Sequence, residues 1–254
     1  MINVKNKAIS WLLPLFTVMI MVIIWQILAT IINLNIILPT PFLALKEFFN
    51  CFTEKDFYLA LFLTLARTII CYFVCFITGY LLGYISFKNE KFSIALSPLI
   101  NLFRTVPTMS VILLILLWIN YEIAPVIIAF IVVFPIAYSS SLSGYKSLDL
   151  SLFDMAKIYK IDDKTLYKHY ILPTLFDKFS ASSVAELLLT FKIVISGEVM
   201  AETAMGLGEL IKQSKYSLET GKLFAYTIVS VLLGLALEYL LKGIINLLKK
   251  RGKL

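Results

Sequence analysis

The sequence is dominated by apolar runs long enough to cross a lipid bilayer. A hydrocarbon core about 30 Å thick requires about 20 predominantly apolar residues in a helix. Hydrophobic residues make up 60% of the 254-residue chain and charged residues only 15%. The runs predict an all-α membrane protein with six transmembrane helices, at residues 11–34, 61–87, 103–119, 124–141, 179–200 and 224–245. Pro98, Arg104 and Pro107 lie around the start of the third span, so we expect it to begin as a broken or interfacial helix.

The distribution of basic residues predicts the orientation of these spans. With six spans, both termini lie on the same side of the membrane. Placing the N-terminus in the cytoplasm puts fifteen Lys and Arg side chains in cytoplasmic segments and five in external ones. Short cytoplasmic loops are enriched in Lys and Arg, so this bias favours cytoplasmic termini and explains the net charge of +7 without a nucleic-acid partner.

The sequence lacks the common signatures of an energy source or of covalent chemistry. It contains no Gly-rich phosphate loop, no cluster of metal ligands and no nucleophile elbow. Cys71 and Cys75 stand four residues apart on a predicted helix, but no His or carboxylate accompanies them, so we interpret them as packing residues. We therefore expect one transmembrane domain over residues 1–254, with no catalytic residue, metal or cofactor of its own.

A polar segment of about residues 143–178 separates the fourth and fifth spans. Asp149 is placed to cap a short helix in which Leu150, Phe153 and Ala156 recur at helical spacing. The following Ile-Asp-Asp sequence predicts a second helix that ends at Pro173. An amphipathic helix here suits two positions: in the lipid headgroup layer, or docked on a soluble partner. The sequence pattern alone does not choose between them.

This segment resembles the EAA loop of ABC importer permeases, in which E-A-A is followed at fixed spacing by G, I and L-P. Asp154, Met155 and Ala156 occupy the E-A-A positions and Lys160 the glycine, while Tyr170 replaces the isoleucine and Leu172 and Pro173 match L-P. The spacing is intact although four residue types differ. A lysine at the glycine position leaves open whether the first helix ends as sharply as in the family.

Four further segments strengthen the resemblance and occur in the family's order. They are LPTPFLALKEF, TLARTIICYF, LFRTVPTMSVILLILLWIN and FKIVISGEVMAETAMGLGELI. Together they resemble the nitrate, sulfonate and taurine branch of binding-protein-dependent importers. The resemblance implies a type I importer permease fold, a multi-pass position in the bacterial plasma (inner) membrane, and import of a small organic or anionic solute.

The resemblance also implies partners. They are a second copy of the chain, two ABC ATPase subunits that bind the ATP, an external substrate-binding protein, and the surrounding membrane lipid. Asp154, Met155, Ala156, Lys160, Leu172 and Pro173 would couple the permease to the ATPase. In this interpretation Ala156 lies in the contact surface, because a small side chain allows close approach.

Charged residues inside the predicted spans are further candidate functional residues. A Lys at mid-span costs about 2.5–3.5 kcal/mol on insertion scales, so Lys192 should contact protein or water rather than lipid. Glu186, Glu198 and Glu238 are its candidate ion-pair partners, and Arg67 lies near a span end. Two roles stay open for this set, an intramembrane ion pair and a part of the transport path.

The segment ETAMGLGELIKQSKYSLETG after the fifth span is the longest candidate surface for the binding protein, and Gly206 and Gly208 suit a tight turn within it.

Two alternative functions remain. The same permease could carry a thiamine-precursor pyrimidine, riboflavin or another heterocycle. A membrane-embedded lipid enzyme would need paired carboxylates, for which Asp162 and Asp163 are the only candidates, and these fit a helix cap better.

Overall fold

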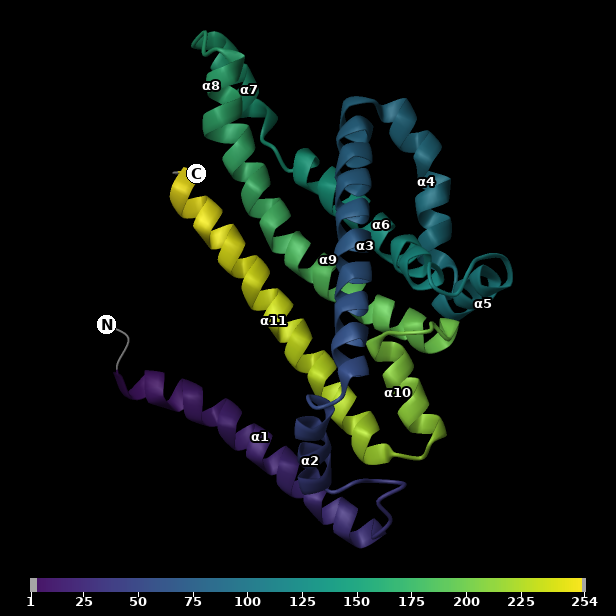
Figure 1. Cartoon of the computed structure of the whole chain (residues 1–254). Coiled ribbons are helices and arrows are strands. Elements are labelled where there is room, and N and C mark those ends of the chain that lie inside the picture. Colours follow the sequence, from purple (N-terminus) through teal and green to yellow (C-terminus); the bar gives the residue numbers. More distant parts are fainter. Residues whose placement is uncertain (1–3, 253–254) are drawn as a thin grey trace. The chain divides into compact units, whose positions relative to one another are not determined.

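The computed structural model describes residues 4–252, which are almost entirely helical, with no strand among them (Figure 1). The all-α class predicted from the apolar runs is therefore confirmed. The helices are α1 (Val4–Ile32), α2 (Pro41–Cys51), α3 (Lys55–Lys88), α4 (Glu90–Thr105), α5 (Thr108–Trp118), α6 (Ala124–Lys146), α7 (Leu150–Ile158), α8 (Asp163–Leu166), the π-helical turn η1 (Tyr167–Ile171), α9 (Leu172–Ala201), α10 (Leu207–Tyr216) and α11 (Thr220–Gly252).

Four of the described helices, α1, α3, α6 and α11, are long and apolar enough to cross a membrane. A fifth span arises if α4 and α5 are counted as one, although their axes differ by 99°. The predicted fifth span lies inside α9, which carries Glu186, Lys192 and Glu198 and so does not qualify by apolarity. Glu186 and Glu198 are nevertheless buried within the chain, which removes their charges from the lipid-facing surface.

The break between α4 and α5 has a local cause. Val106 adopts an extended conformation, with φ −67° and ψ 127°, where α4 ends. The following Pro107 disfavours the helical conformation in the residue before it, so the helix stops there. The break predicted for the third span is therefore present at Val106–Pro107. Pro98, in contrast, lies inside α4, and the helix begins at Glu90 rather than near Phe103.

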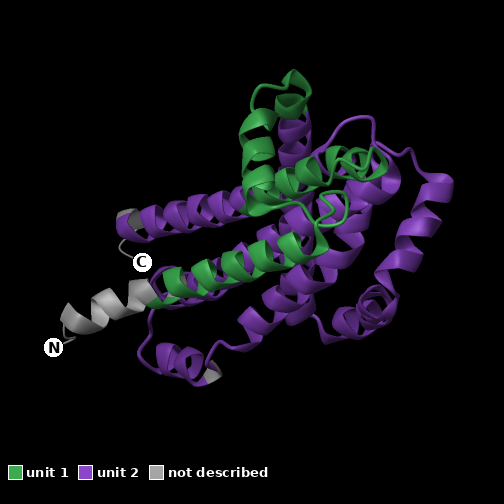
Figure 2. Cartoon of the chain, turned by 90° about the horizontal axis from the view of Figure 1, so that it is seen from below, with its two compact units in different colours: residues 1–59, 210–231 green, residues 60–209, 232–254 purple. Residues whose placement is uncertain are grey.

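The chain divides into two compact units, residues 1–59 with 210–231 and residues 60–209 with 232–254 (Figure 2). In the first unit, the Trp25 indole donates a hydrogen bond to the Pro39 carbonyl at 3.0 Å and stacks on Phe224. Phe57 packs near Tyr226, whose hydroxyl donates to Glu54 at 2.8 Å. These aromatic contacts join the α1–α2 segment to the start of α11.

The second unit is built around the packing of α6 against α9 and α3. Its core includes Cys71 and Cys75, which are free and buried, together with Val133 and Val194. A Cβ added to Gly79 would lie 2.7 Å from the Ala137 Cβ, so α3 and α6 approach more closely than two larger side chains would allow. This close packing forms the frame that holds the ends of α6 and α9.

Candidate functional site

The short helix α7 begins as the sequence predicted. The Asp149 carboxylate accepts hydrogen bonds from the Ser151 amide at 2.9 Å and from the Ser151 hydroxyl at 2.7 Å. These two bonds favour the charged form and hold the pKa of Asp149 below its usual range. The Asp149 amide donates to the Tyr170 hydroxyl at 2.7 Å, which ties the start of α7 to η1.

The end of α7 shows how a lysine can occupy the family's glycine position. Lys160 adopts the left-handed conformation with φ 51°. The Ile161 amide donates to the Ala156 carbonyl at 2.9 Å, and the Lys160 amide donates to the Lys157 carbonyl at 3.1 Å. This pair of bonds is the Schellman motif, which ends a helix sharply. The sharp exit is therefore retained, although a residue with a Cβ usually avoids this conformation.

The two faces of α7 have different surroundings. Ala156 is only 3% exposed and packs against the chain itself, rather than lying on an outer contact surface as the sequence analysis placed it. Met155, Ile158 and Tyr159 are 47%, 77% and 73% exposed and form an apolar surface on the other side. Asp154 is exposed and forms a weak ion pair with Lys157 at 3.7 Å.

The second helix of the loop does not end at Pro173, contrary to the sequence-based expectation. Asp162 caps α8 by accepting from the Thr165 amide at 3.0 Å, as predicted, and the hydrogen bond holds the pKa of Asp162 below its usual range. After α8 the backbone forms the wider π-helical turn η1 and then continues as α9. Leu172 and Pro173 lie in the first turn of α9. A proline lacks an amide proton and its ring clashes with the preceding helical turn, and the wider turn makes room for it.

A buried polar cluster lies at the opposite end of α9. Glu198 is fully buried and all its hydrogen-bonding capacity is directed to the chain. The Thr64 hydroxyl donates to its carboxylate at 2.8 and 3.0 Å, Arg67 Nη1 donates at 2.8 Å, and the Gly208 amide donates at 3.0 Å. The Leu207 amide in turn donates to Thr64 Oγ1 at 2.9 Å. Arg67 and Glu198, both singled out from the sequence, therefore form a buried ion pair.

The same arginine extends the cluster to two loops. Arg67 Nη1 also donates to the Met205 carbonyl at 2.8 Å, while Arg67 Nη2 pairs with Glu122 in the turn before α6. The Ala204 amide donates to the second Glu122 oxygen at 2.7 Å. Sequence reasoning missed Thr64 and Glu122, since both lie far from Glu198 along the chain and no spacing pattern links them.

Gly206 and Gly208 lie beside this cluster, where the backbone comes so close to α9 that a larger side chain would not fit. Gly206 lies in the bend before α10 and Gly208 lies in the first turn of α10, and neither glycine has a positive φ angle. A Cβ on Gly206 would lie 2.6 Å from the Glu198 carboxylate carbon, and a Cβ on Gly208 would lie 2.5 Å from the Ile195 carbonyl oxygen. The backbone of residues 206–208 therefore packs directly on α9, which brings its amides to Glu198.

The other charged candidates are not brought together with Lys192. Glu186 is buried and receives a long hydrogen bond from the Tyr80 hydroxyl at 3.4 Å. Glu238 pairs with Lys242 one turn along α11 at 2.5 Å. Lys192 is exposed and forms no ion pair with any residue that the structure describes, so the expected partners are engaged elsewhere.

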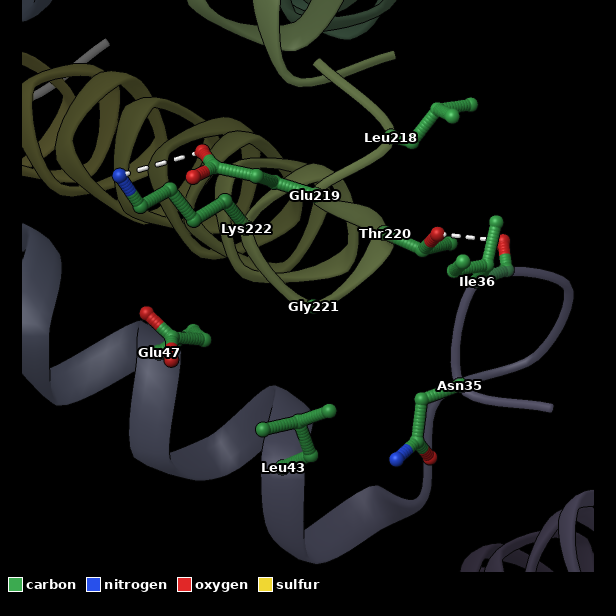
Figure 3. A pocket seen from close by; sticks show the side chains of 9 residues that line it. All are labelled: Asn35, Ile36, Leu43, Glu47, Leu218, Glu219, Thr220, Gly221 and Lys222. Atoms are coloured by element: carbon green, nitrogen blue, oxygen red, sulfur yellow. Dashed lines mark hydrogen bonds and ion pairs between the residues drawn. The ribbon is translucent and has the colours of Figure 1, made fainter. Parts of the chain in front are cut away.

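A pocket of about 220 Å³ lies in the first unit beside the loop between α10 and α11 (Figure 3). The Thr220 hydroxyl donates to the Ile36 carbonyl at 2.5 Å, and Lys222 pairs with Glu219 at 3.2 Å. The pocket includes Leu218, Glu219 and Thr220, which end the segment predicted to face the binding protein. This part of that segment therefore borders a recess with several polar side chains.

Comparison with known proteins identifies relatives over most of the chain. The family described as "Binding-protein-dependent transport system inner membrane component" matches residues 75–251. A Bacillus subtilis protein named as the aliphatic sulfonates transport permease SsuC is 21% identical over 231 residues, which cover 90% of this chain and 83% of that protein. Its Escherichia coli namesake is 27% identical over 231 residues, covering 90% and 86%. Both relatives fall in the sulfonate branch predicted from the motifs.

Solved structures share the fold. An inward-facing structure of the MetNI methionine ABC transporter covers 75% of this chain and 95% of its own, with a TM-score of 0.64 at 15% sequence identity. A second crystal form gives a TM-score of 0.61 at 16% identity, covering 76% and 98%. The permease fold expected from the resemblance is thereby confirmed, and at these identities the comparison concerns the fold alone.

Proposed function

Because this chain belongs to the family of binding-protein-dependent inner membrane transport components, we propose that it carries a small organic or anionic solute of the nitrate, sulfonate or taurine type into the cytoplasm. The chain is a multi-pass inner membrane permease and a transporter subunit rather than an enzyme. Membership implies an ATPase and a substrate-binding protein as partners. The named relatives, aliphatic sulfonate permeases at 21% and 27% identity, support the choice of solute.

In this proposal two copies of the chain associate within the lipid bilayer and two ATPase subunits bind at their loops of about residues 143–178. ATP binds to those subunits and not to this chain. The observation that carries the coupling role is that α7 has apolar side chains on its outward side as well as on its buried side. Ala156 packs inward, while Met155, Ile158 and Tyr159 present an apolar surface outward from a loop that is otherwise polar. A second protein that covers this surface would remove it from water.

The remaining loop residues have supporting roles in this proposal. Lys160 ends α7 sharply, so that Ile158 and Tyr159 stay at its tip. Leu172 and Pro173 start α9 directly after η1, which connects movement of the loop to this long helix. Asp154 is exposed at the edge of the outward surface and can meet a basic residue of the ATPase.

Ile158→Asp tests the coupling role. The charge would be placed at a contact that becomes desolvated, so we expect ATPase co-purification and ATP-driven uptake to fall at least about tenfold. Membrane abundance should stay normal, because Ile158 is 77% exposed and its change disturbs no internal packing. Ile158→Leu is the matched control and should behave as the parent.

If Ile158→Asp complexes assemble and transport normally, α7 lies in the headgroup layer instead. Ala156→Arg is the weaker test, because Ala156 is buried and its replacement would disturb the loop itself. A reconstituted chain without its partners should hydrolyse no ATP, and robust hydrolysis by the isolated chain would contradict the transporter role.

The cargo requires a separate experiment. Thermal stabilisation of the associated binding protein by ethanesulfonate or taurine would support the proposed solute class. Stabilisation by a thiamine-precursor pyrimidine or riboflavin instead would select the alternative cargo while leaving the coupling role intact.

A further inference from the structure

One stripe of α9 is unlike the other outward surfaces of the chain. Its exposed positions are Asp177, Lys178, Ala181, Ala185, Lys192 and Ser196. At 3.6 residues per turn these positions all lie within about 60° of Lys192 around the helix axis. Most of the exposed large side chains of residues 232–248 on α11 are, in contrast, apolar, with Lys242 and Asn246 as the polar exceptions; the apolar ones are Leu232, Leu235, Tyr239, Leu240, Ile244, Leu247 and Leu248. The α9 stripe is therefore polar and small where a lipid-facing surface is apolar and large.

Lys192 is the charged group in the middle of this stripe. It lies eight residues before Met200, which corresponds to about 12 Å of helix. That distance exceeds the reach of a lysine side chain to the end of the span. The structure supplies no counter-charge within the described residues, since Glu198 bonds Arg67 and Glu238 bonds Lys242. A cation in this position must face water or another protein rather than lipid.

A groove continues the stripe toward the start of α9. It has a volume of about 500 Å³ and lies between α9 and the last turns of α11. Ala181, Ala185 and Leu188 line its α9 side, so the groove ends one helical turn before Lys192. The charges on its other side are neutralised, because Lys249 bonds Asp177 at 2.6 Å and Lys242 bonds Glu238 at 2.5 Å. Lys192 therefore lies one helical turn from a groove that can hold a small solute, and none of the ion pairs described here neutralises its charge.

We propose that Lys192 lies in the transport path and selects for anions. The inference rests on the proposed function, because the path forms between two copies of the chain and each copy contributes one Lys192. Rings of Lys or Arg side chains give anion selectivity in other membrane pores. Lys192 attracts the anionic group of the solute during passage, and the groove below it receives the solute on the cytoplasmic side.

The first test measures water access and does not depend on the cargo. Lys192→Cys is introduced into the complete complex in nanodiscs and treated with the membrane-impermeant reagent sulfonatoethyl methanethiosulfonate. The native cysteines Cys51, Cys71 and Cys75 are buried, so background labelling is low. Leu240→Cys is the matched control, because Leu240 is 65% exposed from the chain but lies on the apolar surface of α11.

We expect rapid labelling of Lys192→Cys and none of Leu240→Cys. Absence of labelling at position 192, or equal labelling of both variants, would overturn the proposal. Because this result needs no transported solute, it separates the path assignment from the identity of the cargo.

The second test measures charge. Uptake of radiolabelled ethanesulfonate into proteoliposomes should fall at least about tenfold in Lys192→Met and stay within about threefold of the parent in Lys192→Arg. Lys91→Met, at an exposed lysine outside the path, is the control.

Normal uptake by a correctly assembled Lys192→Met complex would overturn the proposal. If Lys192→Met and Lys192→Arg both fail to assemble, Lys192 has a packing role and the proposal is also wrong. A parent complex that imports no ethanesulfonate would count against the proposed cargo, and the labelling result would then decide the path.

Discussion

The polar cluster around Glu198 and the loop around α7 are held together in different ways. The hydrogen bonds of the cluster join residues 10 to 143 positions apart, most of them more than 50, and the Glu198 carboxylate is fully buried. The bonds that define α7 join residues two to five positions apart, and they lie at the surface. The cluster therefore depends on the packing of α3, α6 and α9, whereas the loop depends mainly on its own backbone. In the proposed coupling role, this difference would allow the loop to move without unfolding the helices that support it.

The largest expected effect tests the cluster. Arg67→Met would leave the Glu198 and Glu122 carboxylates without their counter-charge, and loss of one partner of a buried ion pair costs about 3–5 kcal/mol. We expect a loss of this size in the free energy of unfolding, measured by detergent-induced unfolding in micelles. Lys242→Met is the control, since its pair with Glu238 is more exposed and should contribute much less to the free energy of unfolding. If Arg67→Met and Lys242→Met lowered the free energy of unfolding equally, the buried cluster would contribute no more to stability than an exposed ion pair.

A smaller effect on stability tests how closely the backbone of residues 206–208 approaches α9. Gly208→Ala would place a Cβ 2.5 Å from both the Ile195 carbonyl oxygen and the Glu198 Cβ, so residues 206–208 must shift. We expect a loss of about 1–3 kcal/mol, in the range of overpacking substitutions. Gly243→Ala, with nothing within 4 Å of the added Cβ, should instead gain up to about 1 kcal/mol through helix propensity. Thermal unfolding of the two variants side by side would measure the contrast.

In the loop, replacement of Lys160 by glycine should stabilise the end of α7 rather than destabilise it. A left-handed conformation costs a residue with a Cβ about 1–2 kcal/mol, a cost that glycine avoids. Lys160→Gly should therefore increase the protection of the Ile161 amide in hydrogen exchange. Lys160→Ala keeps the Cβ and should show no such increase. A loss of protection in Lys160→Gly would mean that the lysine side chain itself holds the loop.

The smallest effect concerns pH. The pKa of Asp149 is lowered by its bonds to Ser151. The stabilisation of α7 by this carboxylate is therefore complete above the unfolded-state pKa of about 3.9 and is lost as the pH falls through the lower folded-state value. Amide protection in α7 should decrease over that interval. Asp149→Asn keeps a capping side chain without titrating and should abolish the pH dependence.

Local features of the chain were predictable from sequence because their causes are local. Both caps, at Asp149 and Asp162, and the break before Pro107 depend on side chains within three residues of the backbone groups they affect. The predicted end at Pro173 failed because a proline stops a helix only when the preceding turn cannot widen, and η1 widens it. The orientation of the spans and the single-domain assignment stay predictions.

The sequence by itself determined the helical class, the membrane position, the family and the existence of a capped loop between the fourth and fifth predicted spans. Only the tertiary structure decided which charges meet, which side of α7 faces outward and why Gly206 and Gly208 are glycines. The physical reason is that helical periodicity shows which residues share a face but not what that face contacts. Glu198 and Lys192 illustrate it: both are charged residues of α9, yet one accepts hydrogen bonds from three donor groups and the other is exposed.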